Sequence, residues 1–118
     1  MDRSKAGAEV LRKLFGEESG PEARGFAAIT RDHLFGEIWT RPGLSLPERS
    51  MITVAVLAAF GREPQLRDHL GGALNLGISP EKLEEVLIHV THYAGWPAGS
   101  TGVRVLREVV AAREKARR

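Results

Sequence analysis

Two side chains that could carry protons, Glu48 and His69, lie in one stretch of the chain, residues 46–76. Glu48 and its neighbour Arg49 directly precede an apolar run over residues 51–60, and His69 follows in the next predicted helix. A histidine is a natural general acid or base near neutral pH. A carboxyl group at the start of a buried helix is subject to two opposing effects, because the helix dipole favours the carboxylate and burial favours the neutral acid. These residues therefore indicate proton transfer as the candidate chemistry.

Both side chains also have an ordinary structural explanation. Ser45 and Glu48 have the S-x-x-E spacing of a capping box, and Glu48 could form a surface salt bridge with Arg49. His69 lies next to Leu70 at the border of an apolar stripe, where a lone histidine is usually a partly buried side chain with a hydrogen-bond partner. From the residue types alone, the structural and the functional interpretations both stay open.

A second polar group consists of His89, His92 and Tyr93 on a later predicted helix. His89 and Tyr93 are four residues apart and share a helix face, and Glu85 lies one turn before His89. We do not expect a metal site, because H-E-x-x-H is absent and the Glu-x-x-His pairs of a di-iron bundle are not found in duplicate. Structural hydrogen bonding by His89 and Tyr93 is the prediction instead.

Glycine and proline divide the chain into helices, and no segment has the alternation of a strand bounded by hairpin turns. The chain is therefore predicted to be all-α, a single-domain helical bundle of about five main helices plus a short helical turn. The run 51–60 is apolar all round, so we expect its helix to be buried on every side. We expect Phe26, Ile29 and either His33 or Leu34 to form the apolar stripe of an earlier helix. The expected segments are a short helix over residues 4–15, helices over 21–34, 47–60, 64–76, 80–94 and from about 98 into the tail, and the turn at 35–39.

The composition narrows the classes of protein further. The 118 residues fit one domain, 1–118, and the absence of cysteine excludes disulfides, thiolate metal ligands and thiol redox chemistry. No run approaches the roughly 20 apolar residues of a membrane helix, and we expect neither a signal peptide nor a membrane partner but a location in the cytoplasm. The net charge is only +2, and the basic C-terminal tail fits a solvated helix end, so we expect no nucleic-acid partner. The apolar stripes are wide for so small a core, which predicts a homo-oligomer.

Five short motifs occur in order between Phe35 and Gly99: R-P-G-L at residues 41–44, E-R-S at 48–50, L-x-x-H ending at His69, G-I-S-x-E-x-L-x-E-V at 77–86, and Y-A-G-W-P-A at 93–98. Through these motifs the stretch resembles the carboxymuconolactone decarboxylase family. The resemblance implies the all-α fold shared with alkyl hydroperoxidase D-like proteins, and assembly into trimers or hexamers. The peroxidase branch of that fold uses a C-x-x-C pair, which this chain lacks.

The decarboxylase branch implies loss of CO2 from 4-carboxymuconolactone in aromatic-compound breakdown, without metal or organic cofactor. The matching positions then make His69 the proton donor or oxyanion partner, Glu48 the group that orients or recharges it, and Arg49 the clamp for a substrate carboxylate. Tyr93 would line the pocket. Decarboxylases of the family tend to read C-G-V-P-A-A-N after this tyrosine, whereas here the large Trp96 intervenes and the Asn is missing, so Trp96 is expected to affect which small carboxylate or lactone binds. The alternative is a non-catalytic oligomer that binds a small carboxylate or a protein partner.

Overall fold

The computed structural model describes residues 2–16 and 24–117. All regular secondary structure in these ranges is helical, which confirms the predicted all-α class. No helix there is both long enough and apolar enough to cross a membrane. The elements in chain order are α1 (Arg3–Phe15), α2 (Phe26–Ile29), η1 (Thr30–Ile38), α3 (Leu46–Ala59), α4 (Glu63–Asn75), α5 (Pro80–Ala94) and α6 (Trp96–Ala116).

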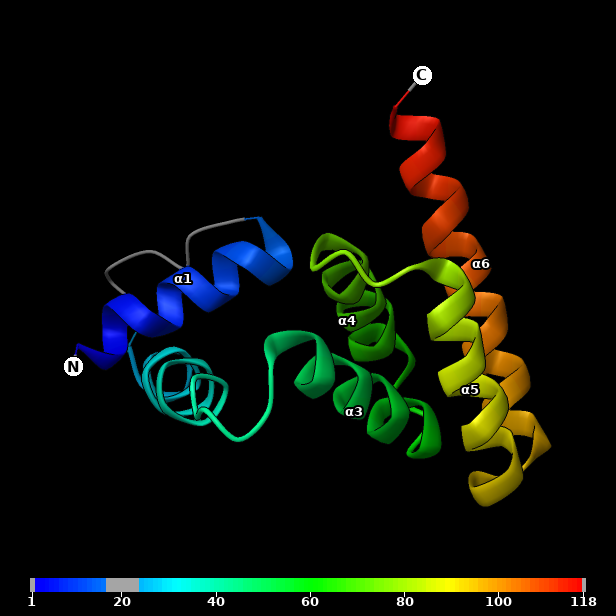
Figure 1. Cartoon of the computed structure of the whole chain (residues 1–118), viewed down its shortest axis with the longest axis horizontal. Helices are drawn as coiled ribbons and strands as arrows, with labels where there is room; N and C mark the ends of the chain where they lie inside the picture. The colour runs from blue at the N-terminus through cyan, green and yellow to red at the C-terminus, as the bar shows by residue number, and fades with distance from the viewer. Residues whose placement is uncertain (1, 17–23, 118) are drawn as a thin grey trace.

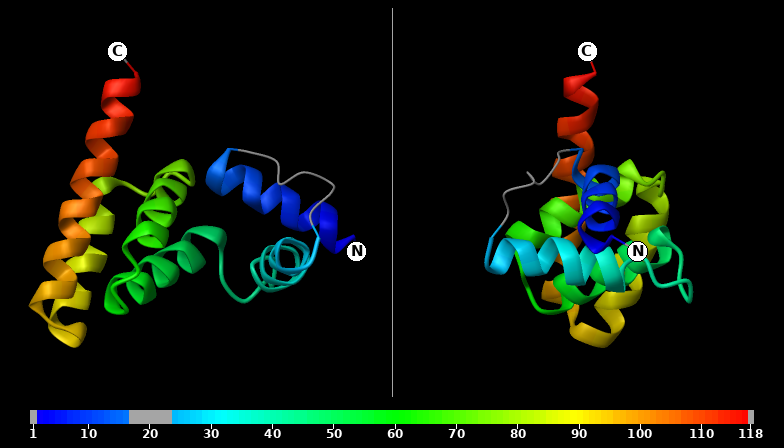
Figure 2. Two further views of the ribbon diagram at one scale, coloured as in Figure 1. Left: turned by 180° about the vertical axis from the view of Figure 1, so that it is seen from behind. Right: turned by 90° about the vertical axis from the view of Figure 1, so that its left-hand side faces the viewer.

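The helices are arranged as three neighbouring pairs (Figures 1 and 2). α5 and α6 form a hairpin on one side, α3 and α4 lie in the middle, and α1 packs against η1 on the other side. Two apolar clusters follow this division. The large cluster is built from α3 to α6, and the small cluster consists of Val10, Leu14, Phe35 and Trp39 from α1, η1 and the residue after η1.

Local capping signals set the boundaries of the middle helices. At the start of α3, the Ser45 hydroxyl accepts the backbone N–H of Glu48 and the Glu48 carboxylate accepts the backbone N–H of Ser45, so the predicted capping box is confirmed. Ser79 caps α5 in a similar way through the backbone N–H of Lys82. Gly61, with φ of 69°, provides the left-handed residue of the turn between α3 and α4.

The segment from Phe26 to Ile38 differs from the prediction in two ways. It is continuous through Ile38 instead of ending near residue 34, and η1 is π-helical, with the Trp39 N–H bonded to the Leu34 carbonyl five residues back. The predicted apolar stripe is also wrong, since Phe26 and Ile29 are exposed. The buried residues of η1 are Arg31, Phe35 and Gly36, and at Gly36 the backbone of η1 is in close contact with that of α1. The beginning of the predicted helix 21–34 lies partly outside the described residues.

The expectation that α3 is buried on every side is wrong for the chain by itself. One row, Ser50, Val54 and Ala58, is buried against the other helices. The row Ile52, Val56 and Phe60 is exposed by 50, 45 and 73%. These rows lie on different faces of α3, and only one of them meets neighbouring helices. The apolar composition of residues 51–60 therefore does not predict which faces of α3 are buried within a single chain.

Candidate functional site

His69 lies on α4 between two aromatic side chains. Its ring meets the Phe15 ring edge to face at 5.3 Å between centroids, and stacks on the Trp39 ring at 6.2 Å. Burial lowers the pKa of His69, and the nearby Asp68 raises it by a smaller amount. The neutral imidazole is therefore the favoured form of His69 in the free protein at neutral pH.

The two aromatic walls come from the ends of distant elements. Phe15 is the last residue of α1, and Trp39 follows directly after η1. Phe35 of η1 contacts both rings, at 6.3 Å from Phe15 and 5.4 Å from Trp39. The side-chain amide of Asn75 donates a 2.6 Å hydrogen bond to the Leu14 carbonyl and so anchors the end of α1 to α4. The packing of α1 and η1 thus fixes the position of the His69 ring.

His69 also marks the border between the two apolar clusters. Leu66 and Leu70, its neighbours along α4, belong to the large cluster of α3 to α6. Trp39, on which its ring stacks, belongs to the small cluster. A polar side chain at such a border is partly shielded from water without being part of either core.

Three polar atoms at these motif positions are buried and have no hydrogen-bond partner among the described residues: Arg49 Nε, Ser50 Oγ and His69 Nδ1. Arg49 and Ser50 lie in the first turns of α3, and His69 lies on α4, which packs against α3. A buried polar group without a partner costs about 1–3 kcal/mol, so such groups are rare unless a ligand or water satisfies them. Each of the three can donate a hydrogen bond, the imidazole in the tautomer protonated at Nδ1. The donor set suits an anionic oxygen.

Glu48 is exposed, and its hydrogen bonds in the structure are those of the cap. Its carboxylate accepts the Ser45 backbone N–H at 2.8 Å, and the hydrogen bonds with Ser45 hold the pKa of Glu48 below its usual value. The capping interpretation is confirmed, but the surface salt bridge to Arg49 is not formed. The Arg49 guanidinium instead donates a 3.0 Å hydrogen bond to the Arg41 carbonyl. Within the described residues, no hydrogen bond joins Glu48 to His69.

Tyr93 and Trp96 lie at the junction of α5 and α6 and are exposed by 83 and 71%. The Tyr93 ring stacks on the His89 ring at 5.0 Å between centroids, a contact that was not predicted from the sequence. The Trp96 ring meets the edge of His92 and lines a groove of about 600 Å³ between α5 and α6. The rings that contact His69 are Phe15 and Trp39 rather than these two. The structure therefore separates the sequence-predicted residues into two places.

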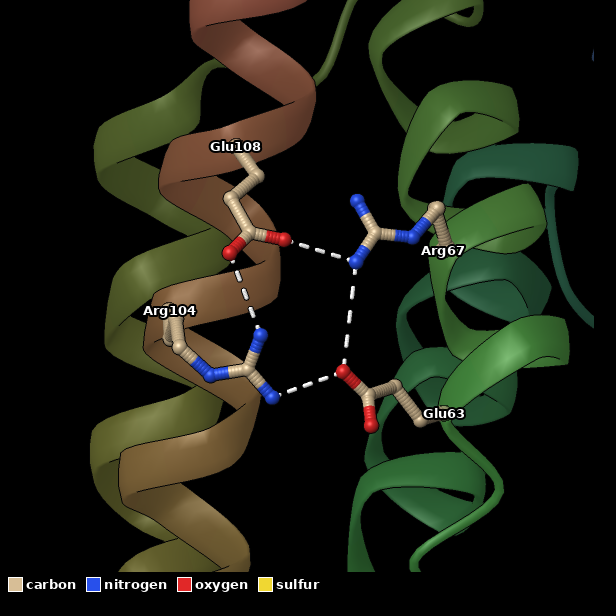
Figure 3. A network of polar contacts seen from close by, with 4 residues as sticks. All are labelled: Glu63, Arg67, Arg104 and Glu108. Carbon is tan, nitrogen blue, oxygen red and sulfur yellow. Dashed lines mark hydrogen bonds and ion pairs between the residues drawn. The ribbon is translucent and has the colours of Figure 1, made fainter.

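A ring of ion pairs fastens α4 to α6 (Figure 3). Arg67 contacts Glu108 at 2.7 Å and Glu63 at 3.9 Å, and Arg104 contacts Glu63 at 2.6 Å and Glu108 at 3.1 Å. Each helix contributes one acid and one arginine four residues apart. This ring was not predicted, although its two i, i+4 pairs are visible in the sequence. The ring helps to fix α4, the helix that carries His69.

The positions of Phe15, Trp39 and Ser50 in the site were not predicted from the sequence either. Phe15 was predicted only as the end of a helix, and Trp39 only as part of the helical turn at 35–39, whereas the structure places residues 35–38 in η1 and buries Trp39 directly after it. Their positions beside His69 depend on how α1 and η1 pack. A group of three or more metal-ligating side chains is not present in residues 2–16 and 24–117.

Comparison with known proteins relates the sequence to one family. A sequence model of the carboxymuconolactone decarboxylase family matches residues 24–108. The chain is 36% identical over 115 residues to 4-carboxymuconolactone decarboxylase of Acinetobacter baylyi, in an alignment that covers 91% of this chain and 86% of that protein. It is 26% identical over 100 residues to nitrosuccinic acid decarboxylase of Metarhizium robertsii, covering 78% of this chain and 70% of that protein. The chain belongs to the carboxymuconolactone decarboxylase family. The matched range extends beyond residues 35–99 on both sides, and it includes Trp39, Arg49 and His69.

Proposed function

We propose that this chain is a cofactor-free decarboxylase that acts on a small carboxylic acid of the 4-carboxymuconolactone type. The observation that carries the proposal is the pair of buried, unpartnered nitrogen atoms, Arg49 Nε and His69 Nδ1, at the motif positions of a family with named decarboxylases. The similarity to two decarboxylases supports the reaction class. A role in aromatic-compound breakdown and a cytoplasmic location are part of the same proposal.

The reaction needs a site that stabilises negative charge and returns a proton. In 4-carboxymuconolactone the saturated carbon that bears the leaving carboxylate is joined through a C=C bond to the lactone carbonyl. When the bond to the carboxylate breaks, CO2 leaves and its electron pair becomes a dienolate with negative charge on the carbonyl oxygen. Loss of CO2 from the nitro-bearing carbon of nitrosuccinic acid would leave a nitronate, which delocalises charge onto oxygen in a similar way. A group that donates hydrogen bonds to an anionic oxygen serves both reactions.

The roles follow from the state of each side chain. Arg49 holds a substrate carboxylate through its unpartnered Nε–H. His69 is neutral before substrate binds, and an anion beside it raises its pKa, so His69 takes up a proton. The imidazolium then donates a hydrogen bond to the forming oxyanion, gives its proton to carbon and returns to the neutral form. Glu48 is exposed to solvent and can take up a proton from it. We assign Glu48 the role of returning a proton to His69 once the Glu48 carboxylate has left the Ser45 cap.

We further propose that the active form is a homo-oligomer, a trimer or hexamer. The exposed apolar row Ile52, Val56 and Phe60 on α3 and the exposed rings of Tyr93 and Trp96 support this, because apolar surface of this kind is usually covered by another subunit. In such an assembly, Tyr93 and Trp96 would act in substrate binding from the junction of α5 and α6. The molar mass in solution, measured by light scattering during gel filtration, tests the assembly.

The reaction is tested by CO2 release from 4-carboxymuconolactone and from nitrosuccinate with purified protein. His69→Gln keeps the size of the side chain and should lower turnover by about 100-fold or more, since it removes the proton donor. His33→Gln, at an exposed histidine of η1 that pairs with Glu37, should leave turnover unchanged. If the wild-type protein releases CO2 neither from 4-carboxymuconolactone nor from nitrosuccinate, the decarboxylase proposal is overturned. Binding of a carboxylate without turnover would then favour the non-catalytic alternative.

A further inference from the structure

Ser50 is fully enclosed by the protein and lies on the side of α3 that faces both apolar clusters. One turn before it, Leu46 packs against the small cluster of α1 and η1. One turn after it, Val54 belongs to the large cluster. Ser50 on α3 therefore lies between the two apolar clusters, as His69 does on α4. The two helices pack against each other.

The hydroxyl of Ser50 differs from other hydroxyls on the same scaffold. Thr53, one turn further along α3, donates a 2.9 Å hydrogen bond to the Arg49 carbonyl four residues back. Thr91 makes the same bond to the Leu87 carbonyl in α5, at 2.8 Å. This local bond is the usual way in which a hydroxyl in a helix is satisfied. Ser50 does not make it, and its Oγ has no partner in the described part of the chain.

A buried hydroxyl without a hydrogen-bond partner stabilises the fold less than the methyl group of an alanine would at the same position. An unsatisfied buried hydroxyl destabilises the fold, whereas a methyl group at the same place would pack against apolar neighbours. The two other buried atoms without a partner, Arg49 Nε and His69 Nδ1, lie at the neighbouring residue and on the facing helix. All three can act as donors, so each could donate a hydrogen bond to an anionic oxygen of a ligand.

We infer that the Ser50 hydroxyl is a further substrate-contacting group, which donates a hydrogen bond to an anionic oxygen of the carboxylic acid held by Arg49. The inference rests on the proposed function and adds a neutral donor to the two nitrogen donors. Such a donor contributes most if the oxygen it faces gains charge as CO2 leaves, as in other sites that stabilise an oxyanion. Loss of the hydroxyl should then lower kcat more than it raises KM.

The test compares Ser50→Ala with Thr53→Val, a neighbouring variant that also removes one hydroxyl from α3. Ser50→Ala should reduce kcat/KM for 4-carboxymuconolactone by about 100-fold, in the range found for a single oxyanion donor. Its melting temperature should equal or exceed that of the wild type, because an unsatisfied hydroxyl is lost. Thr53→Val should keep turnover within about twofold, because its hydroxyl already bonds the backbone.

A binding measurement separates this inference from the proposed function. Muconolactone keeps one carboxylate and the lactone but lacks the leaving carboxylate, so it binds without reacting and can be followed by calorimetry. If the wild type binds it without turning over either acid, the decarboxylase proposal fails, and a Kd at least tenfold weaker in Ser50→Ala still supports the contact. Equal turnover by Ser50→Ala and the wild type, or equal binding where the wild type binds without turnover, would overturn the inference and leave Ser50 Oγ with a structural water only. Absence of both binding and turnover in the wild type overturns both proposals.

Discussion

The close approach of α1 and η1 at Gly7 gives the sharpest stability prediction. A Cβ atom added to Gly7 would lie 1.8 Å from the Arg31 carbonyl oxygen and 3.1 Å from the backbone nitrogen of Gly36. These are backbone atoms, which cannot turn aside as a side chain would. Gly7→Ala can be accommodated only if the two helices move apart.

The size of the effect follows from this contact. The distance must grow from 1.8 Å to the 3.0–3.4 Å at which tight Cβ contacts occur, an opening of more than 1 Å. That movement loosens the small cluster, which includes Leu14 and Trp39. Overpacking of a core costs about 1–3 kcal/mol, and contact with rigid backbone places this case at about 3 kcal/mol. The better helix propensity of Ala returns about 1 kcal/mol, so the net loss is about 2 kcal/mol.

Gly71→Ala is the matched control, because Gly71 also lies inside a helix but has no atom within 4 Å of an added Cβ. It should gain about 1 kcal/mol from propensity alone. The two variants should thus differ by about 3 kcal/mol, or roughly 12 °C in melting temperature for a chain of this size. Urea unfolding followed by circular dichroism measures the difference. A Gly7→Ala variant as stable as Gly71→Ala would refute the backbone contact between α1 and η1.

Two further predictions concern charge. The pKa of His69 is lowered in the folded chain, so the unfolded chain takes up this proton first as the pH falls below about 6.5, and the stability that depends on neutral His69 is present above that pH and decreases below it. Urea unfolding at pH 7.5 and 5.5 should therefore show a smaller loss for His69→Gln than for the wild type, and equal losses would contradict the burial of this ring. The ring of ion pairs predicts that added salt weakens the wild type by screening. Glu108→Gln, which removes one acid from the ring, should have a smaller salt dependence of its melting temperature, and an unchanged salt dependence would show that the ring does not form in solution.

Helix positions were largely predictable because their signals are local. The capping box of Ser45 and Glu48 and the cap at Ser79 act between residues three apart, and the structure places helix starts at both. The motif positions of Arg49 and His69 were also visible, as was the family. These features depend on residue types and short spacings, which the chain carries whatever its tertiary arrangement.

Tertiary structure decided which side chains are buried and which polar atoms have a hydrogen-bond partner. An apolar pattern does not say which face meets another helix, so the exposure of Ile52 and Phe60 was not predictable from α3 alone. The π-helical geometry of η1 and the backbone contact at Gly7 place Trp39 beside His69, from a distant part of the sequence. The sequence alone thus determined the helices and the residue types able to do chemistry. Only packing between distant segments decided which of these residues lose contact with water and stay without a partner, because desolvation depends on every element that surrounds a group.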